Sequence, residues 1–416
     1  MRDSSQSAEY RYHDQPAMTT SSQFTLTSNL IKHKNQRMKC FTVSVLGIAI
    51  FAILLAYVAF ADKDGDGKPD IKVAYVIFRH GDRNPTESYA TDPYNDIKYW
   101  PGGWGALTNK GKLQMYKLGK YLRSRYAELL GETYSSERLL VRSSYADRVI
   151  MSAGALLAGL QPPSTSEIWL PGFNWHPIPI HSTPRSLDQL ITVKKKCPRY
   201  DKELKEAYQS EEISKINTDI ADLYRHLSAN TGQNVSTVLD VEFLFNTLEI
   251  EEANGHKLPD WTKEIYPEKM KEIATISVKI FSQTPSMKRF VGGPLINDMI
   301  EKMVENHKHS LDQKHEVFLI AGHDMTVLNV MRALGFDETS KPDIGAAILI
   351  ELHAGPPGLG ESTDFVKLFY MNSSSTTDPI QLSLNGCDEI CSLDSFVSAL
   401  SHVAIKPSEW ETECNN

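Results

Sequence analysis

The chain has 416 residues, of which 41% are hydrophobic and 23% are charged, so it can bury a sizeable core and is too long for a disulfide-stapled miniature fold. Its formal net charge is −8, which argues against a nucleic-acid binder that works through a broad cationic face. Residues 1–61 hold six basic and three acidic residues, so the remaining 355 residues carry a net charge of −11.

The first 70 residues differ in character from the rest of the chain. Residues 1–40 are polar and aperiodic, which predicts a disordered cytoplasmic tail. Residues 41–61 are 21 consecutive uncharged residues, enough at about 1.5 Å per residue to cross a hydrocarbon core of roughly 30 Å. Basic residues precede this run, so we expect a type II membrane anchor with the rest of the protein luminal or extracellular. Residues 62–70 are interpreted as a linker.

The apolar run also has a second interpretation, as the core of a signal peptide. Ala59-Phe60-Ala61 has the small-x-small form of a cleavage site, and a start at Met38 would give a leader of ordinary length. Under this alternative the protein is secreted after cleavage near Ala61.

Cysteines and glycosylation sequons agree with export. The sequons begin at Asn234 and Asn372, and both lie beyond the apolar run. Four cysteines in the same part of the chain form an even set, which predicts two disulfides in an oxidising compartment. These are Cys197, Cys387, Cys391 and Cys414.

Residues 71–416 are predicted to form the catalytic domain, and three apolar runs within it end in polar clusters. The runs 71–78, 139–141 and 317–321 have the β-branched and aromatic composition of buried parallel strands. The clusters that follow are Arg79-His80-Gly81-Asp82-Arg83, Arg142, and Gly322-His323-Asp324. Because ligands bind outside the carboxyl ends of the strands in an open α/β sheet, we expect these clusters to converge.

Helical patterns alternate with these runs. Thr108 can cap a helix that Gly131 ends, and Gly335 closes a helix expected over residues 326–334. Residues 346–352 and 365–371 are predicted to be further strands. This order indicates a layered α/β domain. Residues 197–293 are charged and poor in strand signals, which predicts a helical cap inserted into that domain.

The first cluster suggests phosphoryl chemistry. Arg79, Arg83 and Arg142 cannot deprotonate, and their planar guanidinium groups match the oxygens of a phosphate. His80 would be the nucleophile that attacks phosphorus and forms a phosphohistidine. Gly81 is expected to let the substrate approach the backbone closely. A single strand-end histidine is more often structural, and Arg142 alone could form a surface ion pair.

The distal cluster supplies the remaining groups that such a reaction needs. Asp324, if protonated, could donate its proton to the leaving oxygen and then activate water as the carboxylate. His323 could hydrogen-bond the phosphoryl oxygens. The joint occurrence of these clusters at strand ends favours a catalytic site over a structural one.

These motifs resemble those of histidine acid phosphatases. Arg79-His80-Gly81-Asp82-Arg83-Asn84-Pro85 matches their R-H-G-x-R-x-P signature, and Gly322-His323-Asp324 matches their distal H-D element. The similarity covers nearly all of residues 71–416 and is strongest to the prostatic and lysosomal acid phosphatase branch. It continues through residues 100–108, Val141-Arg142-Ser143-Ser144 with Asp147-Arg148, residues 188–190, residues 197–200 and residues 410–414.

The resemblance implies a phosphoglycerate mutase-like α/β domain with a smaller helical cap and no metal. The sequence also has no phosphate-cradling Gly-rich Lys motif, no H-E-x-x-H and no clustered Cys/His ligand set, so no cofactor is predicted. The resemblance further implies that His80 is phosphorylated, that Asp324 is the proton donor, and that a homodimer forms. The implied phosphate ligands are Arg79, Arg83, Arg142 and His323. The implied disulfides are Cys197–Cys414 and Cys387–Cys391.

The function predicted is an acid phosphatase acting on small phosphate monoesters or phosphoproteins. A phytase or another more specialised phosphomonoesterase of the same family is one alternative, although the negative charge of the exported part does not favour a polyphosphate substrate. A catalytically inactive ectodomain used for adhesion or signalling is an alternative of a different class.

Overall fold

A mixed eight-stranded sheet forms the centre of the protein in a computed structural model that describes residues 71–308, 316–355, 364–387 and 390–416. Seven strands follow the order β3-β2-β4-β1-β5-β6-β7, and β8 pairs with β6. The predicted tail, apolar run and linker at residues 1–40, 41–61 and 62–70 lie outside the described residues. Within the described ranges, no helix has both the length and the apolar character needed to cross a membrane.

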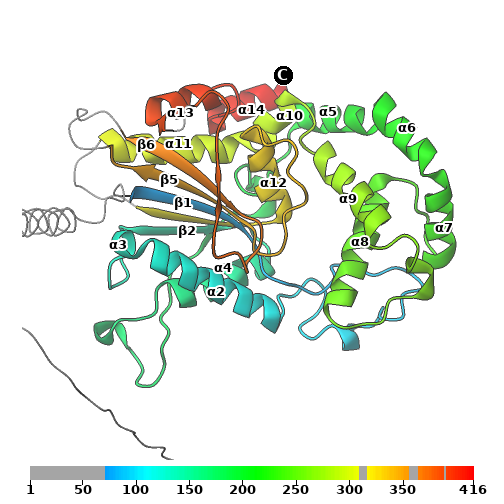
Figure 1. The fold of residues 1–416 in the computed structure, drawn as a ribbon, viewed down its shortest axis with the longest axis horizontal. Helices are drawn as coiled ribbons and strands as arrows, with labels where there is room; N and C mark the ends of the chain where they lie inside the picture. The colour runs from blue at the N-terminus through cyan, green and yellow to red at the C-terminus, as the bar shows by residue number, and fades with distance from the viewer. Residues whose placement is uncertain (1–70, 309–315, 356–363, 388–389) are drawn as a thin grey trace, which may run out of the picture. The chain divides into compact units, whose positions relative to one another are not determined.

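The sheet has a parallel half and an antiparallel half (Figure 1). The parallel half consists of β1 (Ile71–Arg79), β2 (Leu139–Ser143), β3 (His181–Ser182) and β4 (Val317–Gly322). The antiparallel half consists of β5 (Ala347–His353), β6 (Phe365–Met371), β7 (Ile380–Leu382) and β8 (Cys391–Ser392). Because β4 lies between β1 and β2, the three strands whose carboxyl ends were predicted to converge are direct neighbours.

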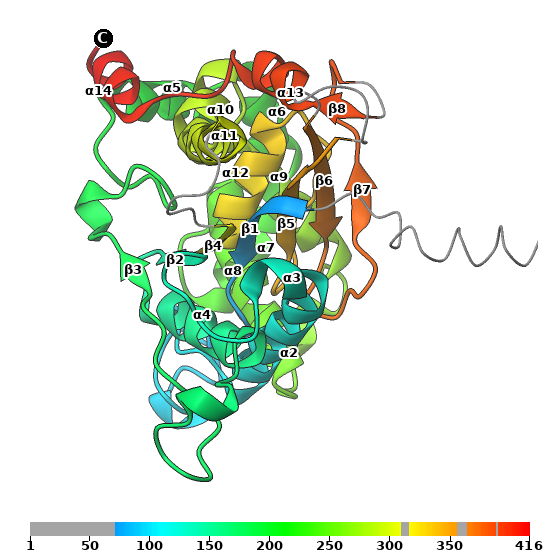
Figure 2. The same cartoon turned by 90° about the vertical axis from the view of Figure 1, so that its left-hand side faces the viewer.

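Helices cover both faces of the sheet (Figure 2). One face packs against α2 (Asn109–Arg125), α3 (Ala127–Leu130) and α4 (Asp147–Leu160). The other packs against α11 (Gly293–Lys308), α12 (Asp324–Ala333) and α13 (Leu393–Leu400). The predicted layered α/β fold is therefore confirmed.

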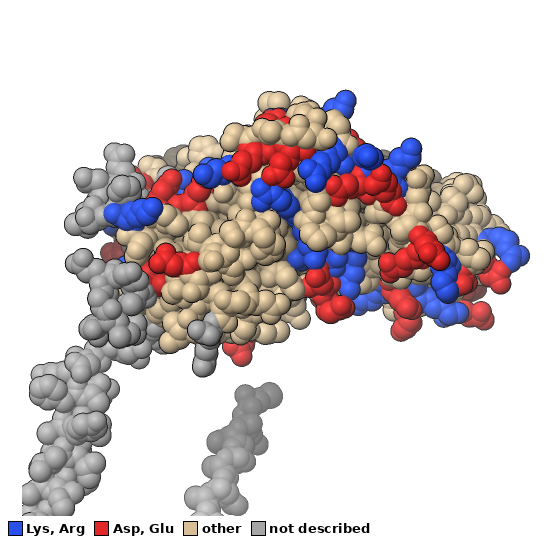
Figure 3. All heavy atoms as spheres, turned by 90° about the horizontal axis from the view of Figure 1, so that it is seen from above, with Lys and Arg blue, Asp and Glu red and all other residues tan. Residues whose placement is uncertain are grey.

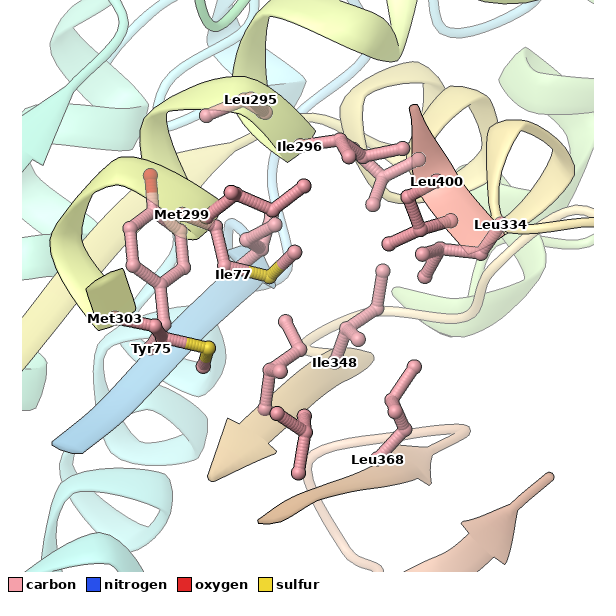
Figure 4. Close-up of a cluster of buried hydrophobic side chains, with 14 of the residues drawn as sticks. Tyr75, Ile77, Leu295, Ile296, Met299, Met303, Leu334, Ile348, Leu368 and Leu400 are labelled. Carbon is pink, nitrogen blue, oxygen red and sulfur yellow. The ribbon is translucent and has the colours of Figure 1, made fainter. Parts of the chain in front are cut away.

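Strand β1 alternates between the two layers, as the two-residue period of a strand requires. Tyr75 and Ile77 point toward α11, where they pack near Met299 and Met303 (Figure 4). Val76 belongs to the core on the α2 and α4 side. This burial on both faces explains why the run carries no charged residue between Ala74 and Phe78.

Local signals in the sequence position the helices near the motif. Thr108 caps α2, where its hydroxyl accepts a hydrogen bond from the backbone N–H of Gly111. A Cβ atom at Gly81 would lie 2.5 Å from the carbonyl oxygen of Gly111. The structure thus shows a close approach of helix α2 at Gly81, while the close approach of a substrate there stays a prediction. Gly335 follows α12 with a φ of 94°, in the region that favours glycine.

Residues 198–291 form helices and, among the described residues of this segment, no strand. The helices are α5 (Pro198–Tyr208), α6 (Glu211–Asp219), α7 (Ala221–Thr231), α8 (Val238–Ala253), α9 (Glu268–Ile280) and α10 (Pro285–Val291). They share a core of their own, which includes Leu227, Leu244 and Met270. In Figure 1, α6 to α9 lie to one side of the sheet. That this segment acts as a cap stays a prediction.

Both disulfides implied by the resemblance are present. Cys197, at the start of α5, pairs with Cys414 in α14 (Pro407–Asn415). Cys387 pairs with Cys391. The first bridge lies in a small core with Phe290 and Trp410, and therefore ties the C-terminal helix to the helical segment.

Charges are mixed on the surface seen from the side of α13 and α14. In Figure 3, Lys and Arg side chains alternate with Asp and Glu side chains over this face. Neither sign of charge occupies it as a continuous field.

Candidate active site

The two motifs meet at the carboxyl ends of β1 and β4. Arg79 is the last residue of β1 and lies opposite Gly322, the last residue of β4. The backbone N–H of His80 donates to the carbonyl of Gly322 at 3.1 Å. The rings of His80 and His323 lie edge to face, with their centroids 5.5 Å apart. The parallel register of two neighbouring strands thus brings together residues separated by more than 200 positions in the chain.

His80 presents one ring nitrogen to the interior of the site. Its side chain is buried, and Nδ1 lies 2.8 Å from the carbonyl oxygen of Gly81. Because a carbonyl oxygen only accepts hydrogen bonds, Nδ1 must carry the proton in this contact. In the neutral ring the lone pair is therefore on Nε2, the nitrogen that would attack phosphorus.

Arg148 faces that lone pair, and it was not among the predicted site residues. Its Nε donates to Nε2 of His80 at 3.3 Å, and its Nη2 lies 3.4 Å from Nδ1 of His323. Nε2 of His323 lies 3.0 Å from the hydroxyl of Ser144. Arg148 is the second residue of α4, the helix that follows β2. Its place just after a strand end was the signal in the sequence that could have identified it.

Arg79 connects the two motifs. Its Nη2 forms an ion pair with Oδ2 of Asp324 at 3.1 Å, and its Nη1 donates to the carbonyl of Pro342 at 2.7 Å. Oδ1 of Asp324 accepts from the backbone N–H of Met325 at the first turn of α12. The Nε of Arg79 is buried and has no hydrogen-bond acceptor among the described residues.

Arg83 adds a second guanidinium with an unused donor. Its Nη1 donates to the carbonyl of Asn84 at 3.0 Å, whereas its buried Nε lacks an acceptor among the described residues. Burial, followed by repulsion from Arg148 and Arg79, lowers the pKa of Arg83 to about 10. We call Arg79, Arg83 and Arg148 the cationic cage. Its excess positive charge and unpaired N–H groups are suited to an anion.

The structure does not bring Arg142 into this cage. Its Nη1 donates to Oδ1 of Asp298 on α11 at 2.9 Å, and Oδ2 of Asp298 accepts from the hydroxyl of Tyr75 at 2.7 Å. The neighbouring Val141 belongs to the core on the opposite face of the sheet. Strand alternation therefore directs Arg142 toward α11, into an ion pair of the kind that the sequence left open as its alternative.

Burial and positive charge keep both histidines neutral in acid. Burial, then the Arg79 guanidinium and further positive neighbours, hold the pKa of His80 well below its usual value. Burial and Arg148 lower the pKa of His323 to about 4. A nucleophilic imidazole in this setting keeps its lone pair at pH values where an exposed histidine would be protonated.

The same positive charges favour the ionised form of Asp324. Burial raises its pKa, but the Arg79 guanidinium and the Lys341 ammonium outweigh burial and hold the pKa well below the usual range for a carboxyl. Asp324 is therefore ionised in the free site. Lys341 was also missed in the sequence. Its ammonium donates to the side-chain oxygen of Asn246 and lies 3.7 Å from Oε2 of Glu249.

A cavity of about 650 Å³ opens beside the cage. Helix α2, helix α8 and the segment after β6 form its walls. The residues that line it are Arg79, Asp82, Arg83, Lys110, Gln114, Lys117, Tyr121, Asn246, Glu249, Ile250, Ala253, Asp343, Ile344 and Ser373 to Thr377. A larger cavity of about 810 Å³ lies between α5 and the C-terminus, and none of the cage residues lines it. No group of three or more His, Cys, Asp or Glu suited to a metal ion occurs in the described part of the chain.

Comparison with known proteins gives a consistent result. The family model described as the histidine phosphatase superfamily (branch 2) matches residues 70–371. Prostatic acid phosphatase of Bos taurus is 32% identical over 372 residues, which cover 87% of this chain and 92% of that protein. Lysosomal acid phosphatase of Xenopus laevis is 31% identical over 349 residues, which cover 83% and 79%.

Solved structures support the same fold. The phytase from Citrobacter braakii aligns with a TM-score of 0.61 at 19% identity, covering 83% of this chain and 99% of that chain. A multiple inositol polyphosphate phosphatase from Bifidobacterium longum, in complex with phosphate, aligns with a TM-score of 0.56 at 11% identity, covering 83% and 96%. At these identities the two structures establish a shared architecture only.

Proposed function

The chain belongs to the histidine phosphatase superfamily, branch 2, and on this premise we propose that it is an acid phosphatase that forms a phosphohistidine on His80. The observation that carries the proposal is the position of Nε2 of His80. Its lone pair faces Arg148 inside a cage of three guanidinium groups. Two of them, Arg79 and Arg83, have a buried Nε–H without an acceptor in the described part of the chain. Such a cage stabilises the charge of a phosphoryl group during transfer.

In the first step, Nε2 of His80 attacks phosphorus and forms the P–N bond while the P–O bond to the leaving group breaks. A proton from Asp324 neutralises the leaving oxygen, so an alcohol departs. In the second step, water attacks phosphorus, the P–N bond breaks, and Asp324 takes a proton from that water. Phosphate is released, and both side chains return to their starting states.

We assign phosphate binding to Arg79, Arg83, Arg148 and His323. In the free site, Arg148 donates to the nitrogen that must attack, so a bound phosphoryl group would take over this donor and release the lone pair. Arg148 thereby takes the role that the sequence suggested for Arg142. The proposal departs from the sequence-based prediction at this residue alone.

The proton donor requires acid conditions. The cage holds Asp324 ionised in the free site, whereas a bound phosphate adds negative charge next to the carboxyl and raises its pKa. A phosphate monoester takes up its second proton near pH 6, so acid pH favours a protonated donor or substrate. The lowered pKa of His80 keeps the nucleophile active under the same conditions.

His80→Ala tests the proposal. We expect this variant to lose at least about 10³-fold of its turnover of a simple aryl phosphate, since an active-site nucleophile is removed. Brief reaction of the wild type with radiolabelled substrate, followed by denaturation, should leave a label on the protein that is stable in alkali and labile in acid. His402→Ala, at an exposed histidine, serves as the control and should keep both activity and label. Wild-type turnover by His80→Ala would refute the assignment.

The same assay separates the alternatives. A phytase should show a higher kcat/KM for inositol hexakisphosphate than for an aryl phosphate, whereas we expect the reverse. An inactive ectodomain should hydrolyse neither compound and should bind phosphate without forming a labelled protein.

We further propose that residues 41–61 anchor the protein with the catalytic domain exported. The charge bias around this run, the two disulfides and the two sequons support this placement. Protease protection on sealed microsomes would test it, because a type II protein loses only its short N-terminal tail to external protease. N-terminal sequencing of the mature protein would separate an anchor from a cleaved signal peptide.

The proposed homodimer has a candidate surface. Strand β3 is an exposed edge strand, and the preceding segment exposes 59% of Trp169, 44% of Phe173 and 40% of Trp175. We propose that a second copy of the chain covers this edge. Light scattering should show a dimer that Trp175→Asp converts to a monomer. A monomeric wild type would refute the proposal.

A further inference from the structure

One wall of the substrate cavity carries positive charge that the proposed reaction does not use. Lys110, Gln114, Lys117 and Tyr121 line the cavity from helix α2. Their spacing of four, three and four residues places them on one face of the helix. Seven residues of helix rise by about 10 Å, so the two lysines stand at different positions along the wall.

The two lysines lack partners in the described part of the protein. Neither ammonium forms a hydrogen bond or ion pair there, and both side chains are exposed. Two other basic residues of α2 are engaged: Lys112 donates to Asn109 at 3.1 Å, and Arg125 pairs with Glu351 at 2.6 Å. Lys110 and Lys117 are therefore available to a ligand in the cavity.

Acidic residues of the cavity do not cancel this charge. Asp82 accepts from the hydroxyl of Thr108 at 2.6 Å, and Glu249 lies 3.7 Å from the ammonium of Lys341. Asp343 is the remaining acid on the wall. The charged residues that line the cavity are four basic side chains, two lysines and two arginines, and three carboxylates, so the lining keeps a net positive charge.

The other walls offer hydrogen-bonding groups. The segment from Ser373 to Thr377 contributes five consecutive hydroxyl residues, and Gln114 and Asn246 contribute amides. Tyr121 is the single aromatic residue among the described lining residues, so a flat base would find little stacking surface. Hydroxyls and amides suit a leaving group that itself carries several hydroxyls.

From this wall we infer that the preferred substrate is a phosphorylated polyol with a second anionic group, such as a sugar bisphosphate. This inference rests on the proposed function. The scissile phosphate occupies the cationic cage, the polyol hydroxyls face the Ser and Thr segment, and the second anion binds Lys110 and Lys117. These lysines determine specificity and take no part in the chemical step.

The test compares fructose 1,6-bisphosphate with fructose 6-phosphate, using phosphate release by the purified full-length protein at low salt. The double variant Lys110→Gln/Lys117→Gln removes the two cavity lysines. Lys112→Gln/Lys120→Gln is the matched control, because it removes two charges from α2 outside the cavity lining. We expect the wild type to favour the bisphosphate about tenfold in kcat/KM, which is about 1.4 kcal/mol.

The cavity variant should lose most of this preference while its kcat/KM for fructose 6-phosphate stays within about twofold, and the control variant should keep it. No preference in the wild type, or an equal loss in both variants, would overturn the inference and leave the phosphatase assignment intact. If the wild type hydrolyses neither sugar phosphate nor an aryl phosphate, the proposed function itself fails.

Discussion

Two buried sites in this protein hold charges of one sign close together. The first is the cationic cage of Arg79, Arg83 and Arg148 around His80. The second lies under helix α8, where Glu251 is fully buried against Asp92 from the segment that follows the catalytic motif. One site has too few anions, and the other has too few cations.

A single shared proton relieves the repulsion between the carboxyl groups of Glu251 and Asp92. Asp92 accepts from the backbone N–H of Tyr94 at 2.7 Å and from the hydroxyl of Ser88. Neither oxygen of Glu251 accepts a hydrogen bond within the described residues. Burial, followed by the negative charge of Asp92, raises the pKa of Glu251 to about 9. A protonated Glu251 can donate to Asp92, so the pair is stable when it holds one proton.

The comparison shows that a buried excess of charge of one sign can stabilise packing at one site and favour anion binding at another. At acid pH the solvent supplies this proton, so the carboxyl pair joins α8 to the segment that contains Asp92 without any ligand. The cage cannot be relieved in this way, because guanidinium groups do not lose protons at acid pH. It needs an anion from outside, which is what a phosphatase requires.

The largest effect is expected at Arg148, and it tests whether the positive charge of the cage serves catalysis. Arg148→Gln should lower kcat/KM for an aryl phosphate by about 10²–10³-fold, because one preorganised donor of the cage is lost. Arg142→Gln should stay within about twofold in kcat/KM and lose roughly 1 kcal/mol of unfolding free energy through its partly exposed pair with Asp298. Steady-state kinetics and urea denaturation measure the two quantities. A large loss of kcat/KM in Arg142→Gln with little change in Arg148→Gln would show that Arg142, and not Arg148, belongs to the site.

These two arginines also show how far the sequence determined the site. His80, Arg79, Arg83, His323 and Asp324 were found because each lies at a strand end or within a few residues beyond it, and strand ends converge in a parallel sheet. Arg142 adjoins one too, but strand alternation turned its side chain to the other face, and its partner Asp298 is 156 residues away. No local pattern indicates which of two faces will carry the ligand.

The fold, like the site, could be predicted where local sequence patterns determine it, but not where contacts between distant segments determine it. The layered sheet domain, the cap of α2 at Thr108 and the ends of β6 were all predicted from periodicity and turn residues. The approach of α2 to Gly81 and the burial of Glu251 against Asp92 depend on tertiary packing between segments far apart in the chain. Lys341 was missed for that reason: its position near Asp324 arises from the loop before β5, which has no pattern of its own.

The carboxyl pair predicts how stability depends on pH. Its folded pKa of about 9 lies above the value of 4.5 for an unperturbed Glu, so the stabilisation is fully present below about pH 4.5 and is lost as the pH rises through 9. Glu251→Gln cannot titrate, yet its amide can donate to Asp92. Between pH 5 and pH 9, the wild type should lose on the order of a few kcal/mol more than this variant.

Urea denaturation at several pH values measures this difference. Glu252→Gln, at the exposed neighbouring position on α8, is the matched control and should follow the wild type. Parallel curves for the wild type and Glu251→Gln would show that Glu251 titrates at an ordinary pH, and the contrast between the two sites would then disappear.

The smallest effect concerns the protonation of His80 itself. Positive neighbours disfavour the imidazolium, so removing one of them in Arg148→Gln should raise the pKa of His80. NMR titration of labelled histidine, assigned with His80→Ala, measures this shift without substrate. Arg142→Gln should leave the titration unchanged, because its charge is paired with Asp298 on the other face of the sheet. Equal shifts in both variants would mean that His80 responds to the charge of the whole protein and not to the cage.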